Sequence, residues 1–331
     1  MQNTPPRIPD VPYLQPNMKL IFPAPLGRRL TILSCLAVMS FSGGRAAARS
    51  PISLDVLQRD GYGSVGLVKE GQNKLYVPTE INGRKIRLLL DTGWGTEGIA
   101  VRIIPSELHV VLEKGVGVTL SASGARTPVG HGTAQSVVMG NVHIQGTPIY
   151  FGRFTEDGFV GRGFLTRNNA VIDLTNLRLY LRPPGKGRRV DLGPALTALG
   201  LAKAPFVYAP HGGFVLNVEV NGLPSQMVLD TGAQVTLLDV RFAKAAHAKG
   251  WGRDLRQIDA AGVISPGDFA GPKTFKIEGI PIQTPVVTLG RFAGYELSGG
   301  KIAGLLGLDV IGLNWGIIDV AQQRFYFTRA N

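Results

Sequence analysis

The sequence predicts a mainly β fold made of two similar lobes, and three observations carry this prediction. First, 44 glycines and 22 prolines separate short apolar runs along the 331 residues, which is typical of strands joined by turns. Second, Asp-Thr-Gly occurs at 91–93 and again at 230–232, each time directly after an apolar run. Third, the residues around the two copies correspond in the same order over most of the chain.

The first element of each copy is a predicted hairpin. "KLYVPTEINGRKIRLLLDTG" covers residues 74–93, and "GFVLNVEVNGLPSQMVLDTG" covers residues 213–232. Each contains an Asn-Gly pair, and the two pairs are 139 residues apart, as are the two aspartates. Apolar residues alternate on both sides of each pair, and Asn-Gly readily adopts positive φ. Both stretches are therefore predicted to form a strand, a tight turn and a second strand.

The correspondence continues beyond the hairpins. Four further pairs of landmarks keep their order: Gly124 with Gly262, 149–154 with 287–292, 158–161 with 304–307, and 170–181 with 316–327. The first two pairs are 138 residues apart and the last two 146, so the second copy contains a short insertion near residues 294–301. A period of this length is that of a domain and not of a solenoid repeat, which indicates an internal duplication.

The duplication divides the chain into two predicted lobes, at 49–182 and 191–331. Residues 183–190 lie between them and combine prolines, glycines and a cluster of basic residues, as linkers do. Residues 1–48 are predicted to be an export signal with a leader. Basic residues precede the apolar run at 30–41, and Ala46-Ala47-Ala48 offers a cleavage site. Met18 is a more natural start than Met1. We therefore expect an exported protein, in the bacterial periplasm or secreted, that stays membrane-anchored only if the signal is uncleaved.

The composition excludes several classes of protein. With 44% hydrophobic and 18% charged residues, most of the chain does not resemble a disordered protein. Cys35, the one cysteine, lies in the predicted signal, so thiol chemistry is excluded from the rest. The net charge of +12 falls to +8 over residues 49–331, where 30 basic residues are interleaved with 22 acidic ones. This balance makes binding to nucleic acid or anionic lipid an unfavoured alternative, and we expect neither a nucleic-acid partner nor stable membrane insertion.

Each copy resembles the retropepsin-type aspartic protease unit: a hairpin, an apolar-apolar-Asp-Thr-Gly loop, a flap hairpin with a glycine, and a late apolar-apolar-Gly strand. Two such units in one chain are similar to the two-lobed pepsin arrangement and to exported bacterial aspartyl proteases. The resemblance covers most of residues 49–331 and is strongest in "VLDTGAQVT" of the second copy. It implies an all-β fold of two β-barrel lobes arranged pseudo-symmetrically around a cleft, with a few short helices.

The resemblance also implies a role for each matching residue. Asp91 and Asp230 would be the catalytic pair. The residues that would support their loops are Thr92, Gly93, Thr231, Gly232, Gly161 and Gly307. The residues that would form flap tips or contact substrate are Gly124, Gly262, Trp94 and Ala233.

The implied activity is hydrolysis of peptide bonds by a water activated between two carboxyl groups. Two carboxylates at about 3 Å cannot both ionise, so they share one proton, and the aspartic proteases are themselves the reference case for this behaviour. We expect no metal and no cofactor, and the five histidines show no spacing typical of metal ligands. The expected partner is a peptide or an unfolded protein. A monomer is expected because one chain supplies both half-sites.

The first loop departs from the usual pattern, which leaves an alternative open. It reads "DTGWGTEG", so Trp94 stands where the second copy has Ala233, and Glu97 is aligned with Thr236. A tryptophan here could line a substrate subsite, block the cleft, or simply pack in a degenerate lobe. The alternative function is therefore a peptide-binding module on the same fold that lacks catalysis.

Overall fold

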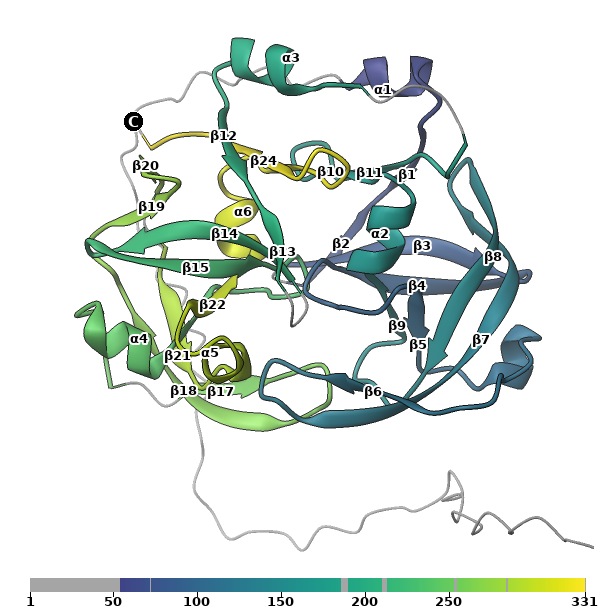
Figure 1. The fold of residues 1–331 in the computed structure, drawn as a ribbon, viewed down its shortest axis with the longest axis horizontal. Coiled ribbons are helices and arrows are strands. Elements are labelled where there is room, and N and C mark those ends of the chain that lie inside the picture. The colour runs from purple at the N-terminus through teal and green to yellow at the C-terminus, as the bar shows by residue number, and fades with distance from the viewer. Residues whose placement is uncertain are drawn as a thin grey trace, which may run out of the picture. The chain divides into compact units, whose positions relative to one another are not determined.

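The computed structural model describes residues 54–71, 73–185, 190–209, 213–252, 255–283 and 285–330. All of them belong to one compact unit, Ser50–Asn331. The predicted export signal at 1–48 lies outside the described residues, as does the basic cluster at 186–189 of the predicted linker. The described residues are mainly strands with a few short helices, which confirms the predicted fold class (Figure 1).

An eight-stranded sheet is formed by the first half of the chain, in the order β2-β3-β4-β9-β5-β8-β7-β6. Its strands are β2 (Val68–Glu70), β3 (Lys74–Ile81), β4 (Arg84–Asp91), β5 (Ile99–Val101), β6 (Gly117–Leu120), β7 (Arg126–Met139), β8 (Val142–Phe151) and β9 (Gly158–Gly161). Its short helical segments are the 3-10 helix η1 (Pro105–Leu108) and α2 (Arg162–Arg167).

A ten-stranded sheet is formed by the second half, in the order β17-β18-β21-β16-β22-β15-β14-β19-β20, with β13 paired to β14. Its strands are β13 (Val207–Ala209), β14 (Gly213–Val220), β15 (Leu223–Leu229), β16 (Leu237–Asp239), β17 (Leu255–Ile258), β18 (Ile264–Ala270), β19 (Phe275–Ile277), β20 (Ile280–Pro281), β21 (Val287–Gly290) and β22 (Ile302–Leu306). Its helices are α4 (Val240–Ala245), α5 (Ala293–Leu297) and α6 (Leu308–Ile311).

The two sheets repeat one topology, so the two lobes are similar, as predicted. In each, the strand that precedes Asp-Thr-Gly runs parallel to the late apolar strand: β4 pairs with β9, and β15 pairs with β22. In each, the strand that follows the loop pairs antiparallel with the same late strand: β5 with β9, and β16 with β22. The late strand therefore lies between the two sides of each loop and holds them at a fixed separation.

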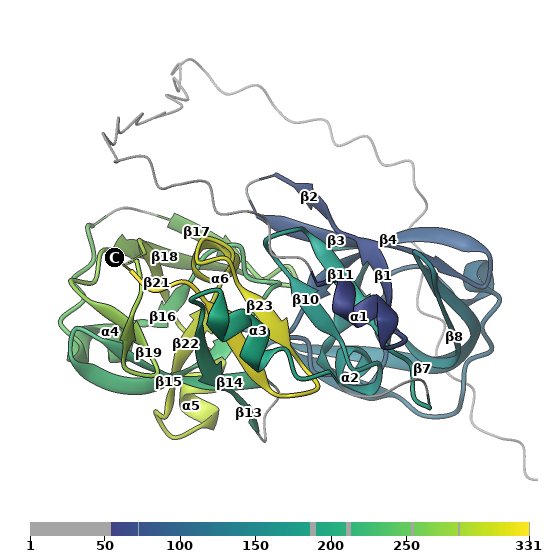
Figure 2. The same ribbon diagram turned by 90° about the horizontal axis from the view of Figure 1, so that it is seen from above.

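A third, six-stranded sheet joins the halves in the order β1-β11-β10-β23-β24-β12. Its strands are β1 (Gly63–Gly66), β10 (Val171–Asp173), β11 (Arg178–Leu181), β12 (Ala202–Pro205), β23 (Ile317–Asp319) and β24 (Arg324–Phe327), and the helices α1 (Asp55–Arg59) and α3 (Gly193–Ala198) lie near it. At its centre β10 lies beside β23 (Figure 2). There Ile172 pairs with Ile318, its own counterpart at the offset of 146. The pseudo-two-fold axis therefore passes between these two residues. The boundaries at 182 and 191 stay a prediction.

Both predicted Asn-Gly turns are present. Asn82 and Gly83 have φ of 47° and 86°, and Asn221 and Gly222 have φ of 50° and 85°. Two successive residues with positive φ match the right-handed twist of the flanking strands, which is why this dipeptide joins β3 to β4 and β14 to β15 so tightly. Each hairpin thus carries its aspartate to the same place in its lobe.

Candidate active site

The two aspartates lie at equivalent points of the two lobes. Asp91 ends β4, and Asp230 directly follows β15. Each carboxyl group accepts hydrogen bonds from the backbone of its own loop: Trp94 N–H donates to Asp91 Oδ1 at 2.9 Å, and Gly232 N–H donates to Asp230 Oδ1 at 2.8 Å. These bonds fix the orientation of both carboxyl groups, because each loop turns back onto the side chain that begins it.

The two threonines lock the loops to each other. Thr92 N–H donates to Thr231 Oγ1 at 3.0 Å, and Thr231 N–H donates to Thr92 Oγ1 at 2.9 Å. Each hydroxyl then donates across the interface, Thr92 to Leu229 O at 2.6 Å and Thr231 to Leu90 O at 2.8 Å. Both side chains are fully buried. The two threonines therefore hold the loops together with all four of their donors in use.

The glycines after the threonines let the aspartates approach the opposite loop. A Cβ at Gly93 would lie 2.7 Å from Asp230 Cγ, and a Cβ at Gly232 would lie 2.4 Å from Asp91 Cγ. Real Cβ atoms do not come this close to another heavy atom, so only glycine fits at either position. The structure therefore brings Asp91, Asp230, Gly93 and Gly232 together, as the sequence predicts.

The two carboxyl groups are hydrogen-bonded to each other and almost fully buried, each side chain being 8% exposed. Burial raises the pKa of Asp91 well above its ordinary value, and the charge of Asp230 and the hydrogen bond to it raise it further. Burial also raises the pKa of Asp230, but hydrogen bonds from Gly232, Asp91, Ala233 and Gly93 oppose this rise. The pair therefore retains one proton to higher pH than an ordinary carboxyl group and titrates as a unit.

Gly161 and Gly307 lie beneath the two loops. A Cβ at Gly161 would be 2.6 Å from Trp94 Cδ1, and a Cβ at Gly307 would be 2.6 Å from the carbonyl carbon of Val235. The residue after each glycine donates to the loop: Arg162 N–H to Trp94 O at 2.8 Å, and Leu308 N–H to Ala233 O at 2.9 Å. At both positions a side chain would therefore collide with the loop that packs there.

Trp94 packs into the first lobe and does not lie between the carboxyl groups. Its ring is 6% exposed, stacks on Phe159 with centroids 4.8 Å apart, and meets Phe154 edge-on at 5.2 Å. Its indole N–H donates to Thr96 Oγ1 at 2.8 Å. Of the three readings open for this residue, the geometry favours packing. The ring fills the lobe beside the loop and leaves the carboxyl groups in contact.

Replacing Trp94 with Ala is expected to lower the free energy of unfolding by about 3–5 kcal/mol, because it removes a stacked ring from a closed cluster. Urea unfolding measures this loss. Trp251, 52% exposed, provides the matched control, and its replacement with Ala should change the stability by less than about 1 kcal/mol. Equal, small losses in both variants would contradict the packing role of Trp94.

The alignment of Glu97 with Thr236 is wrong. In the first lobe Ala100 pairs with Phe159. In the second lobe Leu237 pairs with Leu305, which is the counterpart of Phe159 at the offset of 146. Ala100 and Leu237 are therefore equivalent, and the first loop is two residues longer than the second. The side chain of Glu97 is 80% exposed and lies 3.8 Å from Arg167 in an ion pair. Glu97 is thus a surface residue of the extra turn and no counterpart of Thr236.

Thr236 and Asp309 form a brace under the second loop that sequence reasoning missed. Asp309 accepts from Thr236 N–H at 3.0 Å and from its hydroxyl at 2.8 Å, and Gly307 N–H donates to Thr236 Oγ1 at 3.0 Å. In the first lobe the counterpart of Asp309 is Gly163, whose N–H donates to Thr96 O of the longer loop at 3.2 Å. The two loops are therefore held by different means. The acidic residue two positions after "GLLG" was the available signal.

The predicted flap glycines lie at hairpin tips. Gly124 has φ of 87° in the turn between β6 and β7, and Gly262 has φ of 81° in the turn between β17 and β18. Both values favour glycine because a Cβ is strained there. The tips of the two hairpins lie side by side in Figure 1. The hairpins, β6–β7 and β17–β18, are called the first flap and the second flap below.

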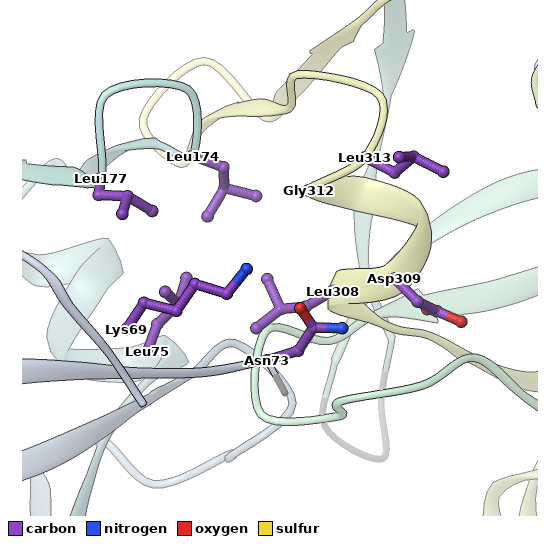
Figure 3. Close-up of a pocket in the computed structure, with 9 residues that line it drawn as sticks. All are labelled: Lys69, Asn73, Leu75, Leu174, Leu177, Leu308, Asp309, Gly312 and Leu313. Carbon is purple, nitrogen blue, oxygen red and sulfur yellow. The ribbon is translucent and has the colours of Figure 1, made fainter. Parts of the chain in front are cut away.

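A pocket of about 380 Å³ is lined by residues from β2, β3, α6 and the turn between β10 and β11. Figure 3 shows its leucines on two facing sides, with Leu174 and Leu177 opposite Leu75 and Leu308. Asn73 lies on its wall and donates to Gln234 O of the second loop at 3.2 Å. None of its lining residues belongs to either Asp-Thr-Gly, so the pocket is not the place where the carboxyl groups act.

Among the described residues, no group of three or more His, Cys, Asp and Glu side chains is arranged to hold a metal ion. None of the helices in this part of the chain is long and apolar enough to cross a membrane.

Of the comparisons with known proteins, the match to a family model supports an aspartic-protease-like family. Residues 216–310 match the family model of aspartyl proteases, a stretch that includes Asp230 and Gly307 but not Asp91. No match is found among curated proteins. Among solved structures, the aspartic proteinase from Irpex lacteus is 13% identical with a TM-score of 0.49, and the match covers 82% of this chain and 98% of that chain.

Proposed function

We propose that the protein is an aspartic-type endopeptidase that hydrolyses peptide bonds with a water activated between Asp91 and Asp230. The observation that carries the proposal is the pair of buried carboxyl groups, hydrogen-bonded to each other at the ends of two loops that Thr92 and Thr231 lock together. A pair that keeps one proton can remove a proton at one oxygen and supply one at another, which is the requirement of this reaction.

The proposed reaction proceeds in two steps. In the first, the ionised carboxyl group accepts a proton from water while the water oxygen bonds to the carbonyl carbon of the peptide, and the protonated carboxyl group donates toward the carbonyl oxygen. In the second, the carboxyl group that took the proton from water passes it to the nitrogen as the C–N bond breaks. The other carboxylate takes a proton back from a hydroxyl group of the intermediate, which yields a carboxylic acid and an amine and restores the pair with one proton. Burial raises the pKa of both aspartates and the two interact, so the shared proton belongs to the pair and not to one named residue.

The alternative, a peptide-binding module without catalysis, is disfavoured by the position of Trp94. Its ring packs against Phe159 and Phe154, so the carboxyl groups keep the mutual contact that catalysis requires. Binding of a peptide with no cleavage, unchanged in Asp91→Asn and Asp230→Asn, would favour the alternative. Inhibition by a statine-type mimic of the tetrahedral intermediate would favour the endopeptidase, because such a mimic binds both carboxyl groups.

The substrate and the setting are proposed on the same basis. The substrate is an extended segment of a peptide or unfolded protein, held by strand-like hydrogen bonds from the flaps. The protein acts as a monomer, since Thr92 and Thr231 of one chain already complete the paired loops. Export to the periplasm or the exterior is proposed from residues 1–48 of the sequence alone.

The raised pKa of Asp91 predicts a pH dependence of stability. The folded protein holds a proton on the pair that the unfolded chain has already lost above about pH 4, so folding binds a proton in this range. The free energy of unfolding should therefore fall as pH rises from about 4 through the raised pKa of Asp91. Urea unfolding across this range should show a smaller fall in Asp91→Asn, and equal slopes in the two proteins would contradict the shared proton.

A further inference from the structure

Each flap tip is docked on the lobe opposite its own. Ala293 N–H in the second lobe donates to Ala122 O of the first flap at 3.0 Å, and Thr155 N–H in the first lobe donates to Ala260 O of the second flap at 3.2 Å. Ala122 and Ala260 are equivalent at the offset of 138, and so are Thr155 and Ala293. The same docking contact therefore occurs twice, related by the pseudo-two-fold axis.

Apolar packing accompanies both contacts. Ala260 packs against the buried cluster that contains Trp94 and Phe154, and Ala122 packs against the equivalent cluster that contains Val215 and Phe292. A Cβ at Gly124 would lie 3.1 Å from Ala293 Cβ, so the first tip is already in close contact. Each flap thus reaches across to the other lobe, and the two flaps lie on the side of the molecule opposite the six-stranded sheet (Figure 1).

A side-chain hydrogen bond joins the two flaps directly. Ser123 Oγ of the first flap donates to Asp259 Oδ2 of the second at 2.5 Å. Burial would raise the pKa of Asp259, but hydrogen bonds from Ser123, Ser121 and the Val263 and Ala261 amides outweigh it and lower the pKa. The carboxylate is therefore ionised, and hydrogen bonds to a charged acceptor are stronger than neutral ones.

The two flap turns explain why an aspartate occupies one of them. Ser121 and Asp259 are equivalent, and each caps its own turn: Ser121 Oγ accepts from Ala125 N–H at 3.1 Å, and Asp259 Oδ1 accepts from Val263 N–H at 2.9 Å. Asp259 has two side-chain oxygens where Ser121 has one. One oxygen of Asp259 caps its own turn, and the other accepts from Ser123 of the first flap. The equivalent of Ser123 in the second flap is Ala261, so this cross-flap bond has no counterpart related by the pseudo-two-fold axis.

We propose that Asp259 and Ser123 are positioning residues that make the two flaps open as one unit, so that a peptide reaches the carboxyl pair only when both tips leave the opposite lobes together. With the two flaps joined, release of one docked tip pulls on the other. The coupling of the flaps is a property of the fold, while its role in admitting a peptide rests on the proposed function.

Hydrogen exchange tests the coupling without any assay of activity. The amides of Ala293 and Thr155 report on the docking of the first and second flap. In the unaltered protein we expect similar protection at both, because one event exposes both. In Asp259→Ala we expect protection to fall about tenfold or more and by different amounts at the two amides, whereas Ser265→Ala, a flap variant at a residue outside the contacts described above, should change neither. Unchanged protection of both amides in Asp259→Ala would overturn the proposal.

A cross-link tests the role in substrate entry. In the full chain with Cys35→Ser, Ser123→Cys and Asp259→Cys provide two thiols that a short thiol-reactive linker can join. We expect joining the thiols to lower the hydrolysis of an unfolded protein tenfold or more relative to the same variant before it is joined. Hydrolysis by the joined protein at an unchanged rate would refute entry through coupled flaps. Absence of hydrolysis in the unaltered protein, with coupled exchange of both amides, would instead reject the proposed function and keep the coupling.

Discussion

Replacing Asp230 with Asn is expected to lower the rate at which an unfolded protein is hydrolysed about 10²–10⁴-fold. This factor is the rate enhancement that a positioned acid–base group contributes. The amide keeps the size of the side chain and can accept the hydrogen bonds from Gly232 and Ala233, but it cannot take a proton from water. Asp91→Asn should cause a comparable loss, because the remaining carboxyl group then has no partner with which to share a proton. Progress curves with a denatured protein substrate measure both losses.

The folded state serves as the control for these two variants. Because burial of two adjacent carboxyl groups raises both pKa values, the Asn variants are expected to be at least as stable as the original protein near neutral pH. A loss of hydrolysis with intact folding therefore reports on chemistry. Full activity in both variants would refute the assignment of the carboxyl pair.

Loss of the hydrogen bonds that Thr92 and Thr231 make between the loops is expected to have the second largest effect, on both stability and hydrolysis. Thr92→Val removes the acceptor of Thr231 N–H and the donor to Leu229 O, and Thr231→Val removes the equivalent partners of Thr92 N–H and Leu90 O. Each buried group left without a partner costs about 1–3 kcal/mol. The double variant should therefore lose several kcal/mol in urea unfolding and, where still folded, lose hydrolysis because the carboxyl groups are no longer held together.

Thr147 offers a matched control. It is also buried, 3% exposed, but its hydroxyl has no hydrogen-bond partner among the described residues. Thr147→Val should therefore leave the stability unchanged or raise it, since it removes a buried polar group that is unsatisfied. Similar losses in Thr147→Val and in the loop variants would contradict the role assigned to the hydrogen bonds between the loops.

The duplicated part of the fold could be predicted from the sequence because its signals are local. Asn-Gly fixes each hairpin through positive φ, and the apolar run before each Asp-Thr-Gly forms a buried strand whatever the rest of the chain does. The pairing of Asp91 with Asp230 followed from repetition: two copies related by an axis must place equivalent loops at equivalent distances from it.

The features that sequence reasoning missed depend on contacts between distant residues. The two extra residues of the first loop became visible only through strand pairing, in which Ala100 and Leu237 face equivalent partners. A uniform offset hid this difference and led to the wrong alignment of Glu97. The Thr236–Asp309 brace joins residues 73 positions apart, and the Ser123–Asp259 bond joins residues 136 positions apart. A single sequence has no periodicity that reports such pairs.

Titration of the carboxyl groups by carbon-13 NMR tests most directly whether the two loops form one site. With aspartate carboxyl carbons labelled, and with Asp91→Asn and Asp230→Asn for assignment, the signals of the two residues should respond together in two steps. We predict that one proton stays on the pair well above the pH at which ordinary aspartates ionise. Two independent titrations, each at the ordinary value of about pH 4, would contradict a shared proton and with it the proposed hydrolysis.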